Sequence, residues 1–168
     1  MNKSLIKINP GALVCNEAEI SGDVSIGVKT VVHPKARIIA DKGSIIIGDG
    51  NLIEEQATII NCHPGRTLVI GHCNVFEIGT YVEAIAIGSN NVFEAKTFIG
   101  PNIEVTDGCV VGAMCRLTGK EKLNENTVIY GEKCSRRIAL EKPAQQILQL
   151  DFLAKILPNY HHMKGKSK

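Results

Sequence analysis

Residues 87–129 read IGSNNVFEAKTFIGPNIEVTDGCVVGAMCRLTGKEKLNENTVI, and every sixth position, starting at Ile87, is aliphatic or Phe. The same period extends back to Ile8 with three interruptions, so that twenty positions follow it. These positions are Ile8, Val14, Ile20, Ile26, Val32, Ile38, Ile47, Ile53, Ile59, Ile70, Phe76, Val82, Ile87, Phe93, Ile99, Val105, Val111, Leu117, Leu123 and Ile129. A helix face recurs at three and four residues, whereas six is a multiple of the strand period of two. The pattern therefore predicts the hexapeptide repeat of an all-β fold, a parallel β-helix.

The number of hexads predicts the number of coils in this β-helix, and the positions of the interruptions predict which edge is irregular. Three hexads make one triangular coil, so twenty hexads predict six to seven coils stacked at about 4.8 Å. The interruptions follow Ile38, Ile59 and Val82, and each comes after the third hexad of a coil. We therefore expect one edge of the prism to carry every irregularity, the largest being the loop near residues 61–66.

Three coils repeat a short phrase that begins with Asn: NLIE at 51–54, NVFE at 74–77 and NVFE at 91–94. In the alignment of the coils these asparagines fall at the same corner. Stacked amide side chains stabilise stacked strands. The phrase thus predicts an amide ladder inside one corner.

The same phrases end in Glu54, Glu77 and Glu94, which we expect to stack one coil apart on the outside. Two unit charges at that spacing repel by roughly 1 kcal/mol in water and about 3 kcal/mol near a protein surface. One hypothesis is that neighbouring cations such as Lys96, together with salt, screen them. The other is that they form a contact stripe for a basic partner.

The period ends after the last hexad, which divides the chain into three predicted parts. Residues 1–135 form the repeat, residues 136–160 a C-terminal segment, and residues 161–168 a basic, flexible tail. Apolar residues over 144–157 follow a helical pattern, and Pro158 is expected to end that helix. We expect the helix to pack along a flank or close an end of the β-helix, with partner binding as the alternative.

Composition excludes several classes of function. The chain has 168 residues and a net charge of +2, which suits one domain and argues against nucleic acid as a partner. No uncharged run reaches the ~18–20 residues of a membrane helix, so no membrane insertion is expected. The N-terminus lacks a signal-peptide pattern, and none of the six cysteines forms a C-x-x-C pair. Free thiols in a reducing compartment are therefore expected.

Two segments resemble the gamma-class carbonic anhydrase family. They are ISGDVSIG at 20–27 and IGHCNVFE at 70–77. The first is similar to the family segment that carries an Arg-x-Asp pair, in which Ser21 stands at the Arg position and Asp23 is kept. The second is similar to the segment that carries two of the three zinc-ligand histidines.

The resemblance places the three zinc-ligand positions near Ile39 and at His72 and Glu77, so that one histidine is kept. His63 lies in a loop and at no family ligand position. A catalytic zinc needs three protein ligands. The alternatives are a divergent metalloenzyme of this kind and a hexapeptide acyltransferase using His33, His63 or His72 as base, although none has a neighbouring acid in the sequence. We expect no catalytic, cofactor-binding or metal-binding residues.

Longer phrases resemble the hexapeptide-repeat subunits of the dynactin pointed-end complex. They are VHPKARIIA at 32–40, GNLIEEQA at 50–57, NTVIYG at 126–131 and LQLDFLAKILPNYHH at 148–162. The last phrase is the most specific, because hexapeptide enzymes do not share it. The resemblance implies a left-handed coil and a non-catalytic structural or adaptor role without a cofactor.

The same resemblance implies partners and a location. It implies side-by-side pairing with dynactin subunit 5 and contacts with dynactin subunit 4 and the pointed-end actin-related protein. Dynein and cargo adaptors on microtubules would be indirect partners. The expected location is cytoplasmic and cytoskeleton-associated.

Overall fold

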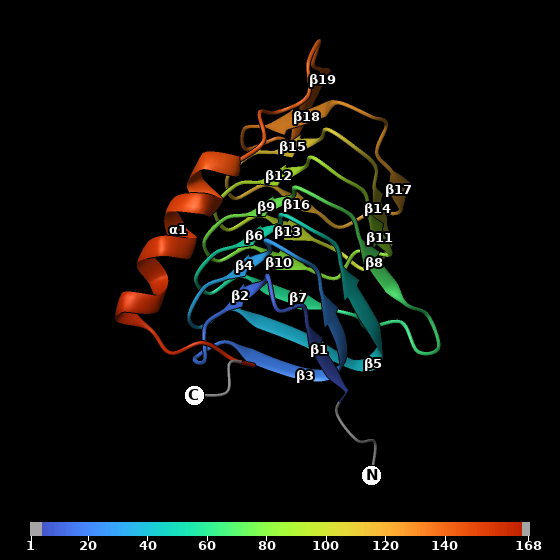
Figure 1. The fold of residues 1–168 in the computed structure, drawn as a ribbon. Coiled ribbons are helices and arrows are strands. Elements are labelled where there is room, and N and C mark those ends of the chain that lie inside the picture. Colours follow the sequence, from blue (N-terminus) through green and yellow to red (C-terminus); the bar gives the residue numbers. More distant parts are fainter. Residues whose placement is uncertain (1–4, 166–168) are drawn as a thin grey trace.

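Residues 5–165, which the computed structural model describes, wind into a triangular prism of stacked coils (Figure 1). The first face is a sheet of eight strands, in which the last strand alone is antiparallel. In spatial order its strands are β2 (Leu13–Val14), β4 (Val31–Val32), β6 (Leu52–Ile53), β9 (Val75–Phe76), β12 (Val92–Phe93), β15 (Val110–Val111), β18 (Thr127–Tyr130) and β19 (Ser135–Ile138).

A second sheet of eleven strands folds over the other two faces. The second face holds β7 (Thr58–Ile60), β10 (Tyr81–Val82), β13 (Phe98–Ile99) and β16 (Arg116–Leu117). The third face holds β1 (Ile6–Ile8), β8 (Leu68–Ile70), β11 (Ala86–Ile87), β14 (Ile103–Val105) and β17 (Glu121–Lys122). The long strands β3 (Glu19–Ile26) and β5 (Arg37–Ile47) turn through the edge and belong to both faces. We call the edges 1–2, 2–3 and 3–1 after the faces that they join.

The core fills the inside of the prism with the side chains that the period of six selects. Eighteen of the twenty positions are buried, and the other two, Ile8 and Ile20 in the first coil, pack against the same core. Parallel register stacks each of these side chains on its counterpart one coil away, as for Phe76 and Phe93, whose ring centroids lie 4.9 Å apart. The predicted parallel β-helix of hexapeptide coils is confirmed.

Edge 2–3 carries all three interruptions of the period, as the sequence predicts. They lie within β5, between β7 and β8, and between β10 and β11. The pairing of β3 with β5 shifts register between Gly22 and Val24 at this edge. Gly22 has a φ of 83°, and a Cβ there would lie 2.3 Å from the Ala40 carbonyl oxygen, so the bend requires glycine.

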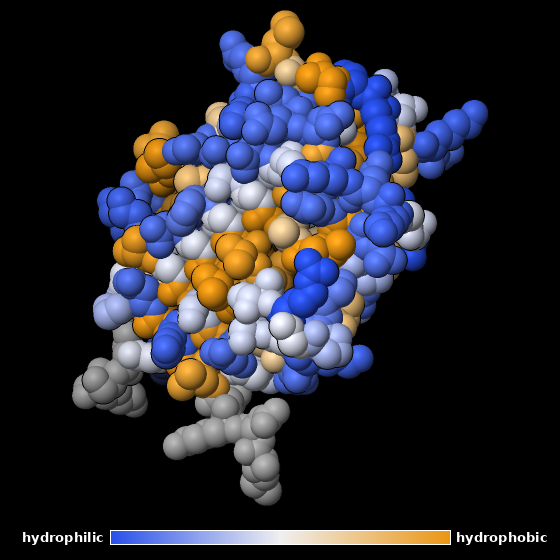
Figure 2. Space-filling model, turned by 90° about the vertical axis from the view of Figure 1, so that its right-hand side faces the viewer, coloured by the Kyte–Doolittle hydropathy of each residue, from blue (hydrophilic) through white to orange (hydrophobic). Residues whose placement is uncertain are grey.

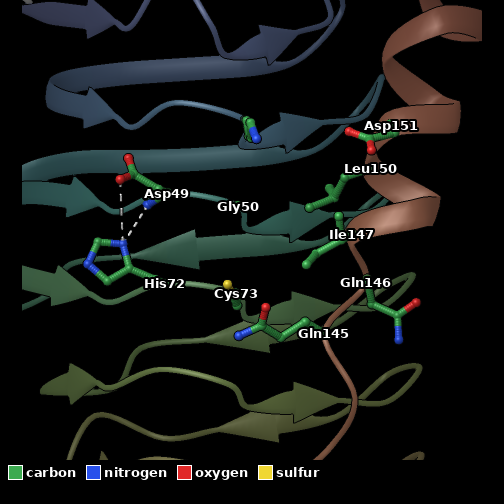
Figure 3. A pocket seen from close by; sticks show the side chains of 10 residues that line it. Asp49, Gly50, His72, Cys73, Gln145, Gln146, Ile147, Leu150 and Asp151 are labelled. Carbon is green, nitrogen blue, oxygen red and sulfur yellow. Dashed lines mark hydrogen bonds and ion pairs between the residues drawn. The ribbon is translucent and has the colours of Figure 1, made fainter.

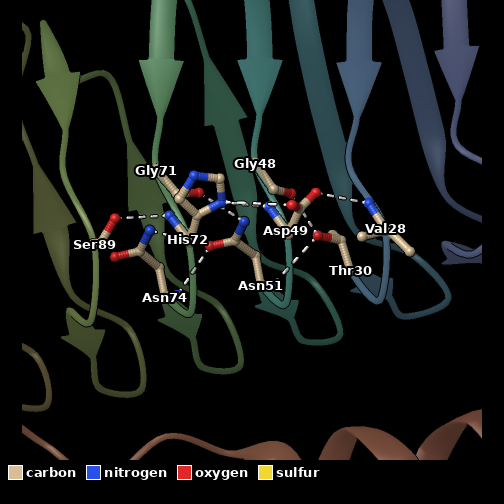
Figure 4. A network of polar contacts seen from close by, with 9 residues as sticks. All are labelled: Val28, Thr30, Gly48, Asp49, Asn51, Gly71, His72, Asn74 and Ser89. Carbon is tan, nitrogen blue, oxygen red and sulfur yellow. Dashed lines mark hydrogen bonds and ion pairs between the residues drawn. The ribbon is translucent and has the colours of Figure 1, made fainter.

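Edge 3–1 contains the predicted amide ladder, of which Figure 4 shows Asn51 and Asn74. The Asn74 amide donates to Asn51 Oδ1 at 3.0 Å, and the Asn91 amide donates to Asn74 Oδ1 at 3.0 Å. The same two oxygens also accept the backbone N–H of the asparagine above. Thr30 continues the ladder below Asn51, and the Cys109 N–H continues it above Asn91. These buried amides therefore satisfy backbone groups at the turns that the strands leave open.

Removing the middle amide tests the ladder. Asn74→Ala leaves the buried N–H of Asn91 without its acceptor, and an unsatisfied buried donor costs about 1–3 kcal/mol. We expect urea denaturation to show a free energy of unfolding that is lower by about 1–3 kcal/mol. Asn102→Ala, at an exposed position, is the control and should leave the transition unchanged. Equal transitions for both variants would contradict this role of the ladder.

Helix α1 (Ile147–Tyr160) lies across the first face (Figure 1). Its Leu150 and Leu157 are buried against the outward side chains of the first-face strands. This second hydrophobic cluster also contains Leu13, Cys15, Val31, Leu52 and Val75. The predicted packing along a flank is confirmed. No helix within residues 5–165 combines the length and apolar character needed to cross a membrane.

The predicted bounds of this helix were wrong at both ends. It begins at Ile147 rather than at residue 144, and it continues through Pro158 to Tyr160. Pro158 lies in the last turn, where its missing N–H removes one hydrogen bond only. The His161 N–H then donates to the Leu157 carbonyl at 2.9 Å and closes the turn.

The chain after the helix returns to the first coil. Met163 forms an antiparallel bridge with Cys15, the Asn16 N–H donates to the His162 carbonyl at 2.6 Å, and the Lys164 N–H donates to the Val14 carbonyl at 2.8 Å. This part of the expected flexible tail therefore lies against β2. Its last residues, 166–168, are outside the described residues.

Candidate functional site

The side chains that the sequence offers as metal ligands lie at three different edges of the prism. His63 lies between β7 and β8 at edge 2–3, His72 between β8 and β9 at edge 3–1, and Glu77 between β9 and β10 at edge 1–2. Ile39, at the remaining family position, is a half-buried residue of β5. These residues thus lie at separate places around the triangle and on three successive coils. No three His, Cys, Asp or Glu side chains within residues 5–165 are grouped to hold a metal ion.

The two residues of the other carbonic-anhydrase-like segment join neighbouring coils at edge 2–3. Ser21 donates to Asp41 Oδ1 at 2.9 Å, and Asp23 accepts from the Ser44 hydroxyl at 2.8 Å. Each bond links β3 to β5. These side chains therefore support the long strands at the edge where the register shifts.

His72 belongs to a polar ladder on the outside of edge 3–1 (Figure 4). Its Nδ1 accepts the backbone N–H of Asp49 at 2.8 Å, and the Ser89 hydroxyl accepts the N–H of His72 at 2.9 Å. Asp49 accepts from the Val28 N–H below, and Asp107 accepts from the Ser89 N–H above. Because Nδ1 is an acceptor, the neutral ring carries its proton on Nε2. The imidazole thus acts as a backbone acceptor.

Sequence reasoning missed this outer ladder, although a signal for it exists. Asp49, His72, Ser89 and Asp107 each stand two residues after an apolar hexad position at the same edge. A polar side chain at that place reaches the backbone N–H of the neighbouring coil. The repeat therefore offers a second periodic position besides the buried asparagine.

A cavity of about 340 Å³ lies between edge 3–1 and the start of α1 (Figure 3). Ile147 and Leu150 line it from the helix, and His72 and Cys73 line it from the prism. Burial raises the pKa of the Cys73 thiol, and the charge of Asp49 raises it further. The thiol therefore stays protonated at neutral pH, and the neighbouring imidazole already uses its acceptor nitrogen. This cavity holds no activated nucleophile beside a base.

His33, a candidate acyl-transfer base, lies at edge 1–2 near the end of α1. Its Nε2 is buried and has no hydrogen-bond partner among the described residues. Burial lowers the pKa of His33, Glu55 opposes this shift and His161 adds to it. The ring is therefore held neutral without an orienting carboxylate bonded to it.

The lowered pKa of His33 predicts a loss of stability in acid. The unfolded chain binds the proton at a higher pH than the folded protein does, so unfolding takes up a proton below about pH 6.5. We expect the free energy of unfolding to fall from pH 7 to pH 5, and His33→Gln to flatten this dependence. Urea denaturation across that range checks it, with the exposed His162→Gln as control. Parallel pH profiles for wild type and His33→Gln would contradict it.

The acidic stripe, defined as Glu54, Glu77 and Glu94, runs along edge 1–2 on consecutive coils. Two of its carboxylates accept backbone hydrogen bonds, Glu54 from the Ile78 N–H at 3.1 Å and Glu77 from the Ala95 N–H at 3.0 Å. Burial raises the pKa of Glu54, whereas its bond to Ile78 lowers it. Backbone donors thus offset part of the repulsion expected from the sequence. Contact of the stripe with a partner stays a prediction.

The stacked hexapeptide coils make this chain a hexapeptide-repeat β-helix protein. A solved structure of a hexapeptide transferase family protein from Anaplasma phagocytophilum is similar, with a TM-score of 0.71. The match covers 92% of this chain and 88% of that chain at 19% identity, which shows the fold alone.

Closer relatives place the chain within one family. Dynactin subunit 6 of Nematostella vectensis is 57% identical over 97% of this chain and 94% of its own length. Dynactin subunit 6 of Xenopus tropicalis is 56% identical over 97% of this chain and 86% of its own length. The chain belongs to the dynactin subunit 6 family. No family model matches it.

Proposed function

We propose that this chain is a structural, non-catalytic subunit of dynactin that acts at the pointed end and supports dynein-driven transport on microtubules. The observation that carries the proposal is the 56% identity to a dynactin subunit 6 over 97% of the chain. The distribution of His63, His72 and Glu77 over three edges supports a role without chemistry.

The partners in this proposal are protein surfaces. Dynactin subunit 5 pairs side by side with the chain, and dynactin subunit 4 and the pointed-end actin-related protein complete the assembly. Dynein and cargo adaptors are reached indirectly, in the cytoplasm. Two surfaces of the prism suit such contacts, the third face and the acidic stripe.

The third face presents aliphatic side chains on a flat surface (Figure 2). Ile46 and Val69 are neighbours on adjacent coils and are 46% and 49% exposed. Ala86 follows on the next coil. Within residues 5–165 the helix covers the first face and leaves this one open (Figure 1). Contiguous exposed aliphatic surface is typical of protein contacts, so we assign this face to the side-by-side β-helix contact.

The acidic stripe supports a second contact. Its carboxylates are half-buried, and Glu94 has no hydrogen bond from its side chain among the described residues. A row of partly desolvated carboxylates attracts a basic surface more strongly than fully exposed ones do. We assign the stripe to a basic partner within the complex.

Affinity purification tests the assembly role. The tagged chain, purified from cell extract, is expected to recover dynactin subunits 4 and 5 and the pointed-end actin-related protein, identified by mass spectrometry. The untagged extract is the control. A homotrimer that carries stoichiometric zinc and no dynactin subunit would contradict the proposal and favour the metalloenzyme alternative.

Surface variants test the two contacts. Ile46→Glu with Val69→Glu places two charges on the third face and is expected to lower recovery of subunit 5 on the order of tenfold. Ile138→Glu, an exposed aliphatic residue of β19, is the matched control.

Glu77→Lys with Glu94→Lys is expected to weaken binding of the basic partner to the acidic stripe. The corresponding Gln variants are the comparison, because they remove the charge but keep an acceptor oxygen for the backbone N–H. Wild-type recovery by a folded variant would remove that surface from the proposal.

A further inference from the structure

Two of the six free cysteines meet at the C-terminal end of the prism. Cys115 is buried at edge 1–2 between β15 and β16, and Cys134 lies half-buried in the turn between β18 and β19. The Cys115 thiol donates to the Gly131 carbonyl at 3.5 Å, and the Cys134 thiol donates to the Arg116 carbonyl at 3.8 Å. Each sulfur thus contacts the backbone segment that carries the other. The two thiols are close enough that Cys134 contributes to the raised pKa of Cys115.

The spacing of the coils suits a bond between these sulfurs. Neighbouring coils lie ~4.8 Å apart, and disulfides join Cα atoms about 4.4–6.8 Å apart. The register of β15 with β18 has an offset of eighteen residues, so Cys134 is one residue beyond the position opposite Cys115. Cys134 packs against the core cluster that contains Cys115, so the turn already holds its side chain toward the interior. The contact of each thiol with the backbone beside the other cysteine places the two side chains close together.

A basic cavity gives access to one of the two thiols. Cys134 lines a space of about 260 Å³ together with Arg116, Lys120 and Arg136. The Arg136 guanidinium is held in place by two hydrogen bonds of 2.6 Å to Glu121. Cys115 is 2% exposed and does not line this cavity. Three cations and one carboxylate, Glu121, line the cavity, so its net positive charge favours a small anionic oxidant that reacts first at Cys134.

We propose that Cys115 and Cys134 form a redox site that glutathione disulfide, a small anionic disulfide, oxidises to an intramolecular disulfide. The Cys134 thiolate attacks one sulfur of glutathione disulfide, forms a mixed disulfide and releases one glutathione thiolate. Cys115 then attacks the Cys134 sulfur, forms the protein disulfide and releases the second glutathione thiolate. The two released thiolates take up the two protons that the cysteines lose, so one disulfide is reduced as one forms.

The environment of Cys115 slows the second of these two attacks. Burial raises the pKa of the Cys115 thiol, and the neighbouring Cys134 and Glu94 raise it further. The small thiolate fraction at Cys115 therefore makes its attack on the mixed disulfide the slower step. The resulting disulfide would tie the β18–β19 hairpin to the coil beneath it and hold the end of the core closed.

Peptide mapping of the full-length protein tests the proposal. The protein is equilibrated with reduced and oxidised glutathione at rising fractions of the disulfide, alkylated, and digested without reduction. We expect a cross-linked peptide pair containing Cys115 and Cys134, with a mass lower by two hydrogens. Oxidation should raise the thermal midpoint by roughly 5–10 °C, since the bond closes a loop through the last coil.

Serine variants separate this site from general thiol oxidation. Cys115→Ser should stop at a glutathione adduct on Cys134, and Cys134→Ser should form neither product. Cys73→Ser, which removes another partly exposed thiol, should form the cross-link as wild type does. Absence of the cross-link in wild type at every ratio would overturn the proposal. Equal glutathione labelling of Cys62, Cys73 and Cys134 would overturn it as well.

Discussion

Coil-to-coil register is the constraint on which this structure depends. Each buried side chain stacks on its counterpart one coil away, so the coils must begin at the same edge and in the same phase. The ladder of Asn51, Asn74 and Asn91 fixes that phase at edge 3–1, because each amide bonds to both the side chain and the backbone of the next. Insertions are consequently confined to edge 2–3, where no such ladder runs through the described coils.

Features that follow from this register could be predicted from the sequence. The hexad positions, the amide ladder and the single irregular edge repeat along the chain, so each appears several times in the alignment of the coils. The antiparallel strand β19, the return of Met163 to Cys15 and the end of α1 at Tyr160 occur once each. They depend on contacts between distant segments, and no repeated pattern in the sequence predicts them.

The candidate site likewise has features that the sequence predicts and features that it does not. Sequence comparison treats His72 and Glu77 as remnants of a zinc site, five residues apart. In a hexapeptide coil five residues reach from one edge to the next, so the two side chains lie at different corners. Both accept a backbone N–H of a neighbouring coil. Residue type and spacing therefore identified these two residues as candidates. Their hydrogen-bond partners are backbone groups, which spacing alone does not predict.

An antiparallel segment lies at each end of the first face, and this affects the number of coils in the stack. At one end β19 runs antiparallel to β18, and at the other Met163 forms an antiparallel bridge with Cys15, next to β2. A further parallel coil would have to pair with the outer edge of β18 or of β2, and these antiparallel segments lie along those edges. Within residues 5–165 the stack of first-face strands is thus covered at both ends, which sets the number of parallel coils that the face contains.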